Sequence, residues 1–325
     1  MILDLRERQR RLFLRLKSIE SGCALIGPAT VQLQLTDLCN LECQYCWYYG
    51  PGSAIRPSGK NHLPYDLIER LVQDCADLQV DKIHLSGVGD PIFHPRFYDL
   101  LCHLERSFSV TVYSNATFPI ERCRDILRAD RIVINLGEAD RESYRALVGK
   151  DLFMKVIRNI RELARLRPQF NPNFCIEVVF VLNRLNEASL PRTQALVRKL
   201  GADKVQIKGF QPSDHNRHMI LPDQVEKTEL EGEWPACYTG WFFSAIRLNG
   251  DVNICIFTHR SSMGNVFKSS FKDIWQSELY TRTRNSALKG EAPFRNYHEC
   301  INCRWTARNK MVGEKMEIYN RAVKA

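Results

Sequence analysis

The sequence predicts an α/β fold whose parallel strands alternate with helices in an open or partial barrel. Six short runs rich in β-branched residues recur between residues 31 and 208, and amphipathic stretches with helical spacing separate them. Strands that alternate with helices pair in parallel through right-handed crossovers. This rhythm stops after Lys208. A different kind of module is therefore expected in the rest of the chain.

The predicted elements follow one another in a regular order. The strands are expected at 31–36, 82–86, 110–114, 132–136, 174–182 and 204–208. The helices between them are expected at 66–79, 95–106, 120–129, 151–166 and 188–200. In such sheets the reactive groups gather at the carboxyl ends of the strands. Residues that directly follow a strand are therefore the candidates for a site.

This pattern divides the sequence into five segments. Apolar residues at helical spacing before the first strand predict a covering helix without a role in chemistry. Pro212 and Pro222 mark a linker. The expected segments are 1–30 for the N-terminal helix and lead-in, 31–210 for the barrel, 211–233 for the linker, 234–305 for a cysteine-bearing module and 306–325 for a C-terminal helix.

Composition places the chain among globular proteins. Its 325 residues are 44% hydrophobic and 26% charged, which suits a packed core with a hydrated surface. The longest apolar runs are too short to cross a bilayer, and the N-terminus lacks the apolar stretch of a secretory signal. We therefore expect a cytoplasmic protein without a membrane partner.

Twelve cysteines are many for a cytoplasmic chain. Thiols stay reduced there, so clustered cysteines indicate metal ligands rather than disulfides. Seven of the twelve fall into two groups with ligand-like spacing. The remaining five are expected to be mostly small buried hydrophobes: Cys23, Cys75, Cys102, Cys123 and Cys175.

The formal net charge of +9 allows several kinds of partner. Lys and Arg are dispersed, without the aromatic-interleaved basic stripe of a nucleic-acid-binding surface, so nucleic acid is not the expected partner. A basic face that docks an acidic electron donor fits the cysteines better, because complementary charge raises encounter rates.

The first cysteine group directly follows the first predicted strand. Cys39, Cys43 and Cys46 have the spacing CxxxCxxC. A [4Fe–4S] cluster normally takes four cysteines, so three thiolates leave one iron open to a ligand from outside the protein. Zinc sites tend to use two separated ligand pairs that close a tetrahedron, and no such partner pair lies nearby in the sequence. The spacing therefore favours an iron–sulfur cluster over structural zinc.

With Tyr45 between its last two cysteines, this run resembles the signature CxxxCxφC of the radical S-adenosylmethionine (SAM) superfamily, in which φ is aromatic. The resemblance covers roughly residues 30–210 and implies a partial (β/α)6 TIM-like barrel. In that family SAM chelates the open iron, and one electron from the reduced cluster cleaves SAM to methionine and a deoxyadenosyl radical. The radical abstracts hydrogen from the substrate. The cofactor carries the hard chemistry, while the protein positions and shields it.

The resemblance also implies SAM contacts at later strand ends. The turn Ser86–Pro91 is similar to the family's GGEP turn, which meets the SAM amino group, although Asp90 replaces the usual Glu. A plain Gly-rich turn is the alternative for this segment. The polar residues at the next two strand ends, Ser114-Asn115 and Asn135, could instead cap helices, and Arg145 is either a partner of the SAM carboxylate or an exposed helix residue. The candidate contacts are Tyr45, Gly87, Val88, Gly89, Asp90, Pro91, Ser114, Asn115, Asn135, Arg145 and Val205.

A second cysteine group lies in the module after the linker. Between Cys237 and Cys255, an Asn-Gly turn at Gly250 predicts a β-hairpin that brings the two cysteines together. Cys300 and Cys303 complete the group. Four thiolates can ligate an iron–sulfur cluster fully. On ligand types alone, a structural zinc site with four cysteines remains open.

This module resembles the twitch domain, the shortened form of the SPASM extension of radical SAM enzymes. The hairpin and the segment from Gly264-Asn265-Val266 to Ile274-Trp275 both match it. A full SPASM domain has further cysteines after the CxxC pair, and none follows Cys303 here. The resemblance therefore implies one auxiliary [4Fe–4S] cluster in addition to the SAM-binding one. The spacings are similar to those of radical SAM dehydrogenases of the butirosin-pathway type, which act on an aminocyclitol.

These features favour oxidation of a small polar metabolite, such as a sugar or aminocyclitol, with the auxiliary cluster as electron acceptor and a flavodoxin- or ferredoxin-type reductant. About 30 residues precede the first strand, fewer than the leader-peptide-binding domain of peptide-modifying relatives needs. Peptide epimerisation or cross-linking is the alternative within enzymes, and Cys175 or Cys123 would then be the conceivable hydrogen donor. A non-enzymatic iron–sulfur or zinc carrier or regulator is the alternative outside them. Residues placed by location alone as substrate contacts are Tyr48, Tyr49, His94, Lys208, Gln211, His215 and Trp241.

Overall fold

The computed structural model describes residues 4–210, 212–222, 236–258, 261–291, 300, 303 and 306–324. The chain forms two compact units. The first contains Met1–Leu33, Leu63–Ile83 and Glu226–Ala325, and the second contains Gln34–His62 and His84–Val225. Gln211, one of the residues placed by location as a substrate contact, lies outside the described residues.

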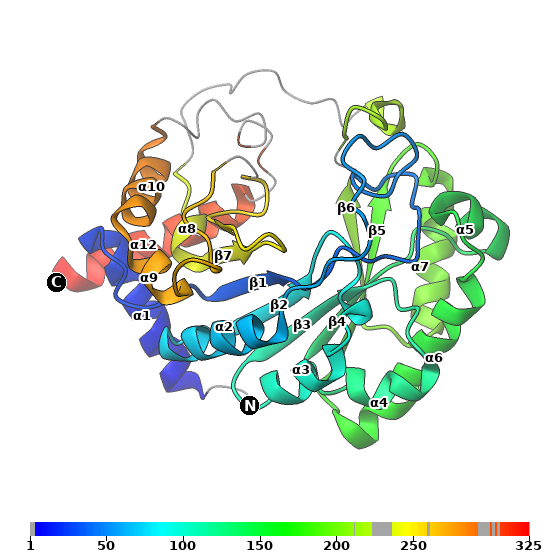
Figure 1. Cartoon of the computed structure of the whole chain (residues 1–325), viewed down its shortest axis with the longest axis horizontal. Coiled ribbons are helices and arrows are strands. Elements are labelled where there is room, and N and C mark those ends of the chain that lie inside the picture. The colour runs from blue at the N-terminus through cyan, green and yellow to red at the C-terminus, as the bar shows by residue number, and fades with distance from the viewer. Residues whose placement is uncertain are drawn as a thin grey trace. The chain divides into compact units, whose positions relative to one another are not determined.

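Parallel strands form the centre of the second unit (Figure 1). Strands β3 (Ser109–Ser114), β4 (Arg131–Asn135), β5 (Cys175–Leu182) and β6 (Lys204–Gly209) pair in parallel in chain order. Strand β2 (Lys82–Ser86) is next to β3 in the strand order. The middle residues of β4 and β5 are buried in succession, as expected for parallel strands covered on both faces.

Helices follow the strands of the second unit as the hydrophobic periodicity predicts. They are α3 (Phe97–Leu104), α4 (Cys123–Ile126), α5 (Arg141–Val148), α6 (Phe153–Phe170) and α7 (Leu190–Lys199). Three short 3-10 turns precede helices of this set, and a fourth follows β6: Pro91–Phe93, Ile120–Arg122, Glu187–Ser189 and Arg217–Met219. Helix α6 buries Val156, Ile160 and Leu163 at i, i+4 and i+7, the stripe that a helix packed on a sheet requires. The α/β prediction is thus confirmed, and α5 is the helix that it missed.

The first unit joins terminal helices to the cysteine-bearing module. It contains α1 (Leu5–Ser21), β1 (Thr30–Gln34), α2 (Tyr65–Asp77), α8 (Thr239–Phe242), β7 (Phe243–Ile246), β8 (Val252–Asn253), α9 (Phe271–Gln276), α10 (Glu278–Lys289) and α12 (Thr306–Lys324). The predicted hairpin is present as antiparallel β7 and β8. Strand β7 also pairs in parallel with β1, a pairing that the sequence pattern does not reveal.

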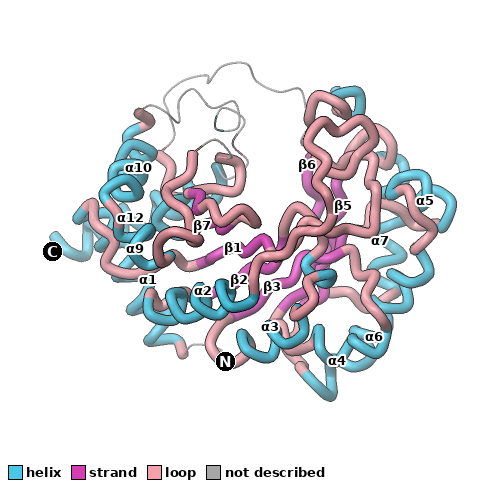
Figure 2. The backbone as a smooth tube through the Cα atoms, viewed as in Figure 1, coloured by secondary structure: helices cyan, strands magenta, loops and turns pink. Residues whose placement is uncertain are grey.

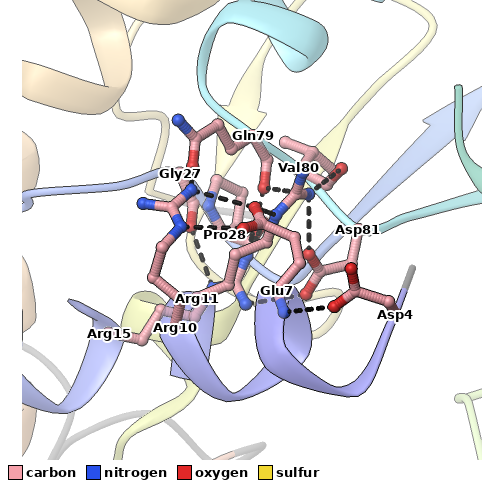
Figure 3. Close-up of polar contacts among 10 residues, drawn as sticks. All are labelled: Asp4, Glu7, Arg10, Arg11, Arg15, Gly27, Pro28, Gln79, Val80 and Asp81. Carbon is pink, nitrogen blue, oxygen red and sulfur yellow. Dashed lines mark hydrogen bonds and ion pairs between the residues drawn. The ribbon is translucent and has the colours of Figure 1, made fainter. Parts of the chain in front are cut away.

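Arginines fasten helix α1 to the turn that precedes β2 (Figure 3). The buried Arg15 donates to the Asp81 carboxylate at 2.7 Å and to the Gly27 carbonyl at 3.1 Å. Arg11 reaches the same carboxylate at 3.0 Å and pairs with Glu7 at 2.7 Å. The helix expected before the first strand therefore has a structural role in the first unit.

None of the helices that the structure describes has the length and apolar character of a membrane span.

Candidate active site

The first cysteine group lies in a long loop that spans residues 35–62 and contains neither helix nor strand (Figure 2). A single β-bridge pairs Thr36 with His62 near its ends. The buried Asp37 carboxylate accepts hydrogen bonds from the Asn61 backbone at 2.7 Å and from the Asn61 side chain at 2.6 Å. Buried loop backbone needs such partners. Asp37 therefore holds the cysteine loop closed at its base.

A second network ties this loop to the end of β3. The Asn115 amide donates to Asn40 Oδ1 at 2.8 Å, and Asn40 Nδ2 donates to the Thr117 hydroxyl at 3.0 Å. The buried Asp90 carboxylate accepts from the Asn115 backbone at 2.6 Å and from the Ser114 hydroxyl at 3.0 Å. Side chains at successive strand ends thus hold one another in place.

The three cysteines line one cavity of about 410 Å³, which lies within the second unit. Small-molecule sites are typically a few hundred to 1,000 Å³, so this cavity is a small one. Its walls are Cys39, Leu41, Cys43, Tyr45, Cys46, Tyr49, Ser86, Gly87, Val88, Gly89, Asp90, Tyr113, Ser114, Asn115, Val133, Asn135, Val148, Val179, Val181 and Lys208. Most of the residues that the family resemblance singled out therefore meet at one place.

The thiols of this group lie in surroundings that disfavour a lone negative charge. Burial raises the pKa of Cys39 to about 12 and raises that of Cys43 as well. Several donors face the sulfurs: the Tyr49 N–H lies 3.3 Å from Cys46 Sγ, and the Leu41 N–H faces Cys39. Iron binding would displace the thiol protons, and N–H donors to sulfur tune the potential of an iron–sulfur cluster.

The residues of the cavity fit an iron–sulfur cluster that carries SAM. Three thiols share the cavity with Asn135, whose buried Oδ1 has no hydrogen-bond partner among the described residues. A ligand amino group would satisfy that acceptor. Within the described part of the chain, no three His, Cys, Asp or Glu side chains are placed to hold a metal ion. The cysteines of a [4Fe–4S] cluster bind different iron atoms.

The two glycines of the Ser86–Pro91 turn have different steric roles. A Cβ atom on Gly89 would lie 2.2 Å from the Leu38 carbonyl oxygen and 2.6 Å from the Asp37 carbonyl carbon. A Cβ on Gly87 would meet nothing closer than 3.4 Å. The Gly89 N–H also donates to the Thr36 carbonyl at 3.1 Å. Gly89 thus lets the turn pack directly against the backbone of the cysteine loop.

Three of the candidate SAM contacts lie away from the cavity walls. Pro91 is buried at the start of a 3-10 turn, and Arg145 is exposed on α5. Of the two alternatives given for Arg145, its position is that of an exposed helix residue. Val205 pairs with Val178, whereas the cavity residue Val179 pairs with Gln206. Because strand side chains alternate between faces, Val205 points away from the cavity.

Of the residues placed by location alone, some line the cavity and others lie elsewhere. Tyr49 and Lys208 line the cavity, whereas Tyr48 and His94 are not among its walls. His215 contacts the cysteine loop from outside, with Nε2 3.0 Å from the Cys46 carbonyl oxygen. Trp241 is buried in an apolar cluster of the first unit.

Sequence reasoning missed three side chains that support or adjoin this site. Asp37 and Asn40 support the cysteine loop, as described above. Tyr144 on α5 is fully buried, and its hydroxyl has no hydrogen-bond partner among the described residues. Burial and the nearby Cys43 raise its pKa. Asn40 occupies a variable position of the cysteine signature, so the motif itself gives no signal for it.

The second cysteine group assembles in the first unit. Burial raises the pKa of Cys255, and the neighbouring Cys237, Cys303 and Cys300 thiols raise it further. The other three thiols therefore lie near Cys255, and Cys237 is among them, as the predicted hairpin requires. Gly250 adopts φ +82° in the hairpin turn, a conformation that favours glycine.

None of the twelve cysteines forms a disulfide. Among the scattered five, Cys75 and Cys123 are buried, but Cys23 and Cys102 are exposed and Cys175 is intermediate. The expectation that most of them are buried is therefore wrong. Whether a cysteine at these positions is exposed depends on which side of its helix or turn faces solvent, and not on its residue type.

A cysteine trio and a glycine turn at strand ends, with a separate four-cysteine group, define an iron–sulfur enzyme of the radical SAM class. The sequence profile of the Radical SAM superfamily matches residues 33–195, half of the chain, and that of the SPASM iron–sulfur cluster-binding domain matches residues 237–304. The chain belongs to the radical SAM superfamily. Membership with this second domain implies SAM and two [4Fe–4S] clusters as cofactors.

Known proteins similar to this chain have several activities. The "tungsten-containing aldehyde ferredoxin oxidoreductase cofactor-modifying protein" of Pyrococcus furiosus is 22% identical over 295 residues, which cover 77% of this chain and 81% of that protein. SuiB of Streptococcus suis, bound to SAM, has a TM-score of 0.64 at 14% identity, covering 82% of this chain and 70% of SuiB. BtrN in complex with AdoMet and 2-DOIA has a TM-score of 0.51 at 16% identity, covering 86% and 93%. At these identities the structural likeness concerns the fold alone.

Proposed function

We propose that this chain is a radical SAM oxidoreductase that removes hydrogen from a carbon of a small polar metabolite, such as a sugar or aminocyclitol. The observation that carries the proposal is the shared cavity, in which the cysteine trio, the glycine turn and Lys208 all meet. The four-cysteine group gives a place for a second cluster that accepts an electron. Family membership supports the first half of the reaction, and the oxidation step is our inference.

The roles of the chain's own residues follow from their places. Cys39, Cys43 and Cys46 would hold the SAM-binding cluster, and Asn135 would accept a hydrogen bond from a ligand donor. When bound, the cluster and SAM supply a 5′-deoxyadenosyl radical that abstracts a hydrogen atom from the substrate. The apolar walls, among them Val133, would shield this reaction from water.

Lys208 is the residue that we assign as proton acceptor. It is the single Lys, Arg or His among the cavity walls. Its side chain lines the cavity, where burial lowers its pKa, which increases the neutral fraction that can act as a base. Loss of one hydrogen atom, one proton and one electron converts an alcohol carbon to a carbonyl. The electron would pass to the cluster held by Cys237, Cys255, Cys300 and Cys303.

Cavity size supports a small substrate. A volume of about 410 Å³ lies in the lower part of the range of small-molecule sites, so a small molecule or a single side chain would fit. Neither thiol considered as a hydrogen donor for epimerisation, Cys123 or Cys175, is a cavity wall. Cys175 begins β5, and the first wall residue of that strand, Val179, lies four residues further on, roughly 13 Å at strand rise. Epimerisation through these thiols is therefore disfavoured.

Peptide modification is the second candidate. The observation that favours it is the fold shared with SuiB, which has been crystallised bound to the precursor peptide SuiA, with a TM-score of 0.62. A single residue of a peptide could enter the cavity. The net charge of +9 supports an acidic flavodoxin- or ferredoxin-type reductant in either case, and reduced thiols suit the cytoplasm.

The experiment starts from protein reconstituted anaerobically with iron and sulfide. We expect about eight irons per chain and, on reduction, deoxyadenosine from SAM. A panel of sugars, aminocyclitols and short peptides in deuterated water then separates the candidates. Oxidation gives a product that lacks two hydrogens and carries no solvent deuterium at carbon. Deuterium incorporation would overturn oxidation, and iron without deoxyadenosine would overturn the enzyme assignment.

A further inference from the structure

Arg284, on helix α10 of the first unit, is a completely buried cation. Its side chain has 0% exposure. Nε donates to the Gly240 carbonyl at 3.0 Å, and Nη2 donates to the Trp275 carbonyl at 2.7 Å. Nη1 has no hydrogen-bond partner among the described residues. An arginine in such a place needs an explanation, because charged side chains are almost never fully buried unless paired.

Aromatic rings rather than carboxylates surround the guanidinium. Its central carbon lies 3.8 Å from the ring centre of Trp275, 4.1 Å from that of Tyr280 and 5.3 Å from that of Trp241. Among the described residues, no carboxylate forms an ion pair with it. Burial lowers its pKa to about 10, so the group stays protonated at neutral pH. Ring faces stabilise a cation only in part, and a buried charge without a counter-charge is strongly destabilising.

The segments that hold Arg284 are those that carry two cysteines of the second group. Gly240 lies three residues after Cys237, whose N–H donates to Ala287 on the next turn of α10 at 3.2 Å. A Cβ on Gly240 would lie 3.2 Å from Arg284 Cγ and 2.3 Å from Cδ1 of Ile254, the residue before Cys255.

Arg284 and two of the four cysteines thus belong to segments that pack together, because the guanidinium binds the Gly240 carbonyl and Ile254 lies against the same glycine. Four thiolates around a [4Fe–4S] core give an anionic site, and reduction by one electron makes it more negative.

We propose that Arg284 provides the positive charge that offsets the auxiliary cluster and raises its reduction potential. The inference rests on the proposed function in one respect, namely that Cys237, Cys255, Cys300 and Cys303 hold an iron–sulfur cluster. A nearby fixed cation stabilises the more negative, reduced state, because net charge and surroundings set cluster potentials. The cluster would take up one electron from the substrate, and Arg284 would exchange no proton. Arg284 is a positioning residue for charge and touches no substrate.

The test uses the full chain with Cys39, Cys43 and Cys46 replaced by Ala, so that only the auxiliary cluster remains. The midpoint potential is measured by EPR-monitored redox titration in this background. R284Q removes the charge and keeps an N–H donor at the position of Nε, which faces the Gly240 carbonyl, and R284K keeps the charge. R282Q is the matched control, because Arg282 is an exposed arginine of the same helix, paired with Glu278 at 2.6 Å.

We expect R284Q to disfavour reduction at least tenfold, which is 59 mV for one electron, while R284K and R282Q stay near the parent. An unchanged potential in R284Q, or equal shifts in R284Q and R284K, would overturn the inference. If R284Q keeps the parent's thermal transition but does not bind iron, and R284K does bind iron, the positive charge is required for assembly of the cluster. If both variants lose the thermal transition, Arg284 has only a structural role and the inference is wrong. Absence of iron in the parent would instead overturn the proposed function.

Discussion

The two cysteine groups of this chain are held in different ways. Cys39, Cys43 and Cys46 lie in a loop without helix or strand, whose backbone is held by Asp37, and they line a cavity. Cys237 and Cys255 adjoin short elements of a hairpin module, where a helix carries a buried arginine between their segments. The first group is an open site, which needs polar groups to hold its loop around a cavity. The second group is a closed site, which can be packed against a core.

The largest effects should come from removing each group separately. Replacing Cys39, Cys43 and Cys46 by Ala should abolish deoxyadenosine formation, at least a hundredfold, and leave about four irons per chain, because one cubane remains. Replacing Cys300 and Cys303 should also leave about four irons, yet SAM cleavage without substrate turnover should persist. Iron analysis and chromatography of deoxyadenosine measure both. Equal loss of SAM cleavage in the two variants would break the distinction between open and closed groups.

Glycine substitutions should then show which site has the more rigid neighbours. G89A places a Cβ 2.2 Å from the backbone of the cysteine loop, which cannot move without opening the site, so we expect a loss of about 3 kcal/mol and selective loss of the first cluster. G240A meets the side chain of Ile254 at 2.3 Å, which can change rotamer, so about 1–2 kcal/mol is expected.

G87A is the control within the same turn, because its Cβ would meet nothing closer than 3.4 Å. It should lose less than about 1 kcal/mol. Denaturant unfolding and iron content of the three variants give the order. If G87A were as harmful as G89A, steric contact with the cysteine loop would not be the reason for the glycine.

Asp90 should make the open site sensitive to pH. Burial raises its pKa from an ordinary value near 3.8 to about 6, so the folded protein binds the proton more tightly than the unfolded chain does. Its stabilising contribution is therefore complete below about pH 4 and is lost as the pH rises to about 6. Two pKa units correspond to about 3 kcal/mol.

The measurement compares unfolding free energies of the apoprotein and D90N at pH 4 and pH 7. The neutral amide cannot ionise, so the difference between the two proteins should change by about 2–3 kcal/mol between these pH values. A difference that does not depend on pH would show that the hydrogen bonds to Ser114 and Asn115 keep the carboxylate ionised throughout.

The smallest effect concerns the backbone of the open site. Ala116 follows Asn115 with φ +57°, a left-handed conformation that costs a non-glycine residue about 1–2 kcal/mol. A116G should stabilise the protein by about 0.5–1 kcal/mol, since glycine's greater chain entropy offsets part of the gain. A129G, at a buried alanine without positive φ, should destabilise instead. Thermal unfolding should therefore show a gain of stability for A116G and a loss for A129G, and equal signs would contradict the prediction.

Local patterns in the sequence predicted the architecture closely. The strands at 82–86 and 204–208 correspond to β2 and β6 within a residue, because alternation and helical spacing are properties of short segments. Helix α5 was missed, since its eight residues follow a strand end whose polar residues indicate a site equally well. The grouping of Cys39, Cys43 and Cys46 around one cavity was also predictable, because their spacing is encoded in a continuous stretch.

The sequence by itself determined the residue types that can bind iron, their spacing and the alternation of strands and helices. Only the tertiary structure decided that Val205 points away from the cavity, that Asp90 binds the end of β3, and that Arg284 is buried beside the second cysteine group. Those outcomes depend on strand register and on contacts between segments far apart in the chain. A local pattern contains no record of them, because burial and electrostatic surroundings are set by residues tens to hundreds of positions away.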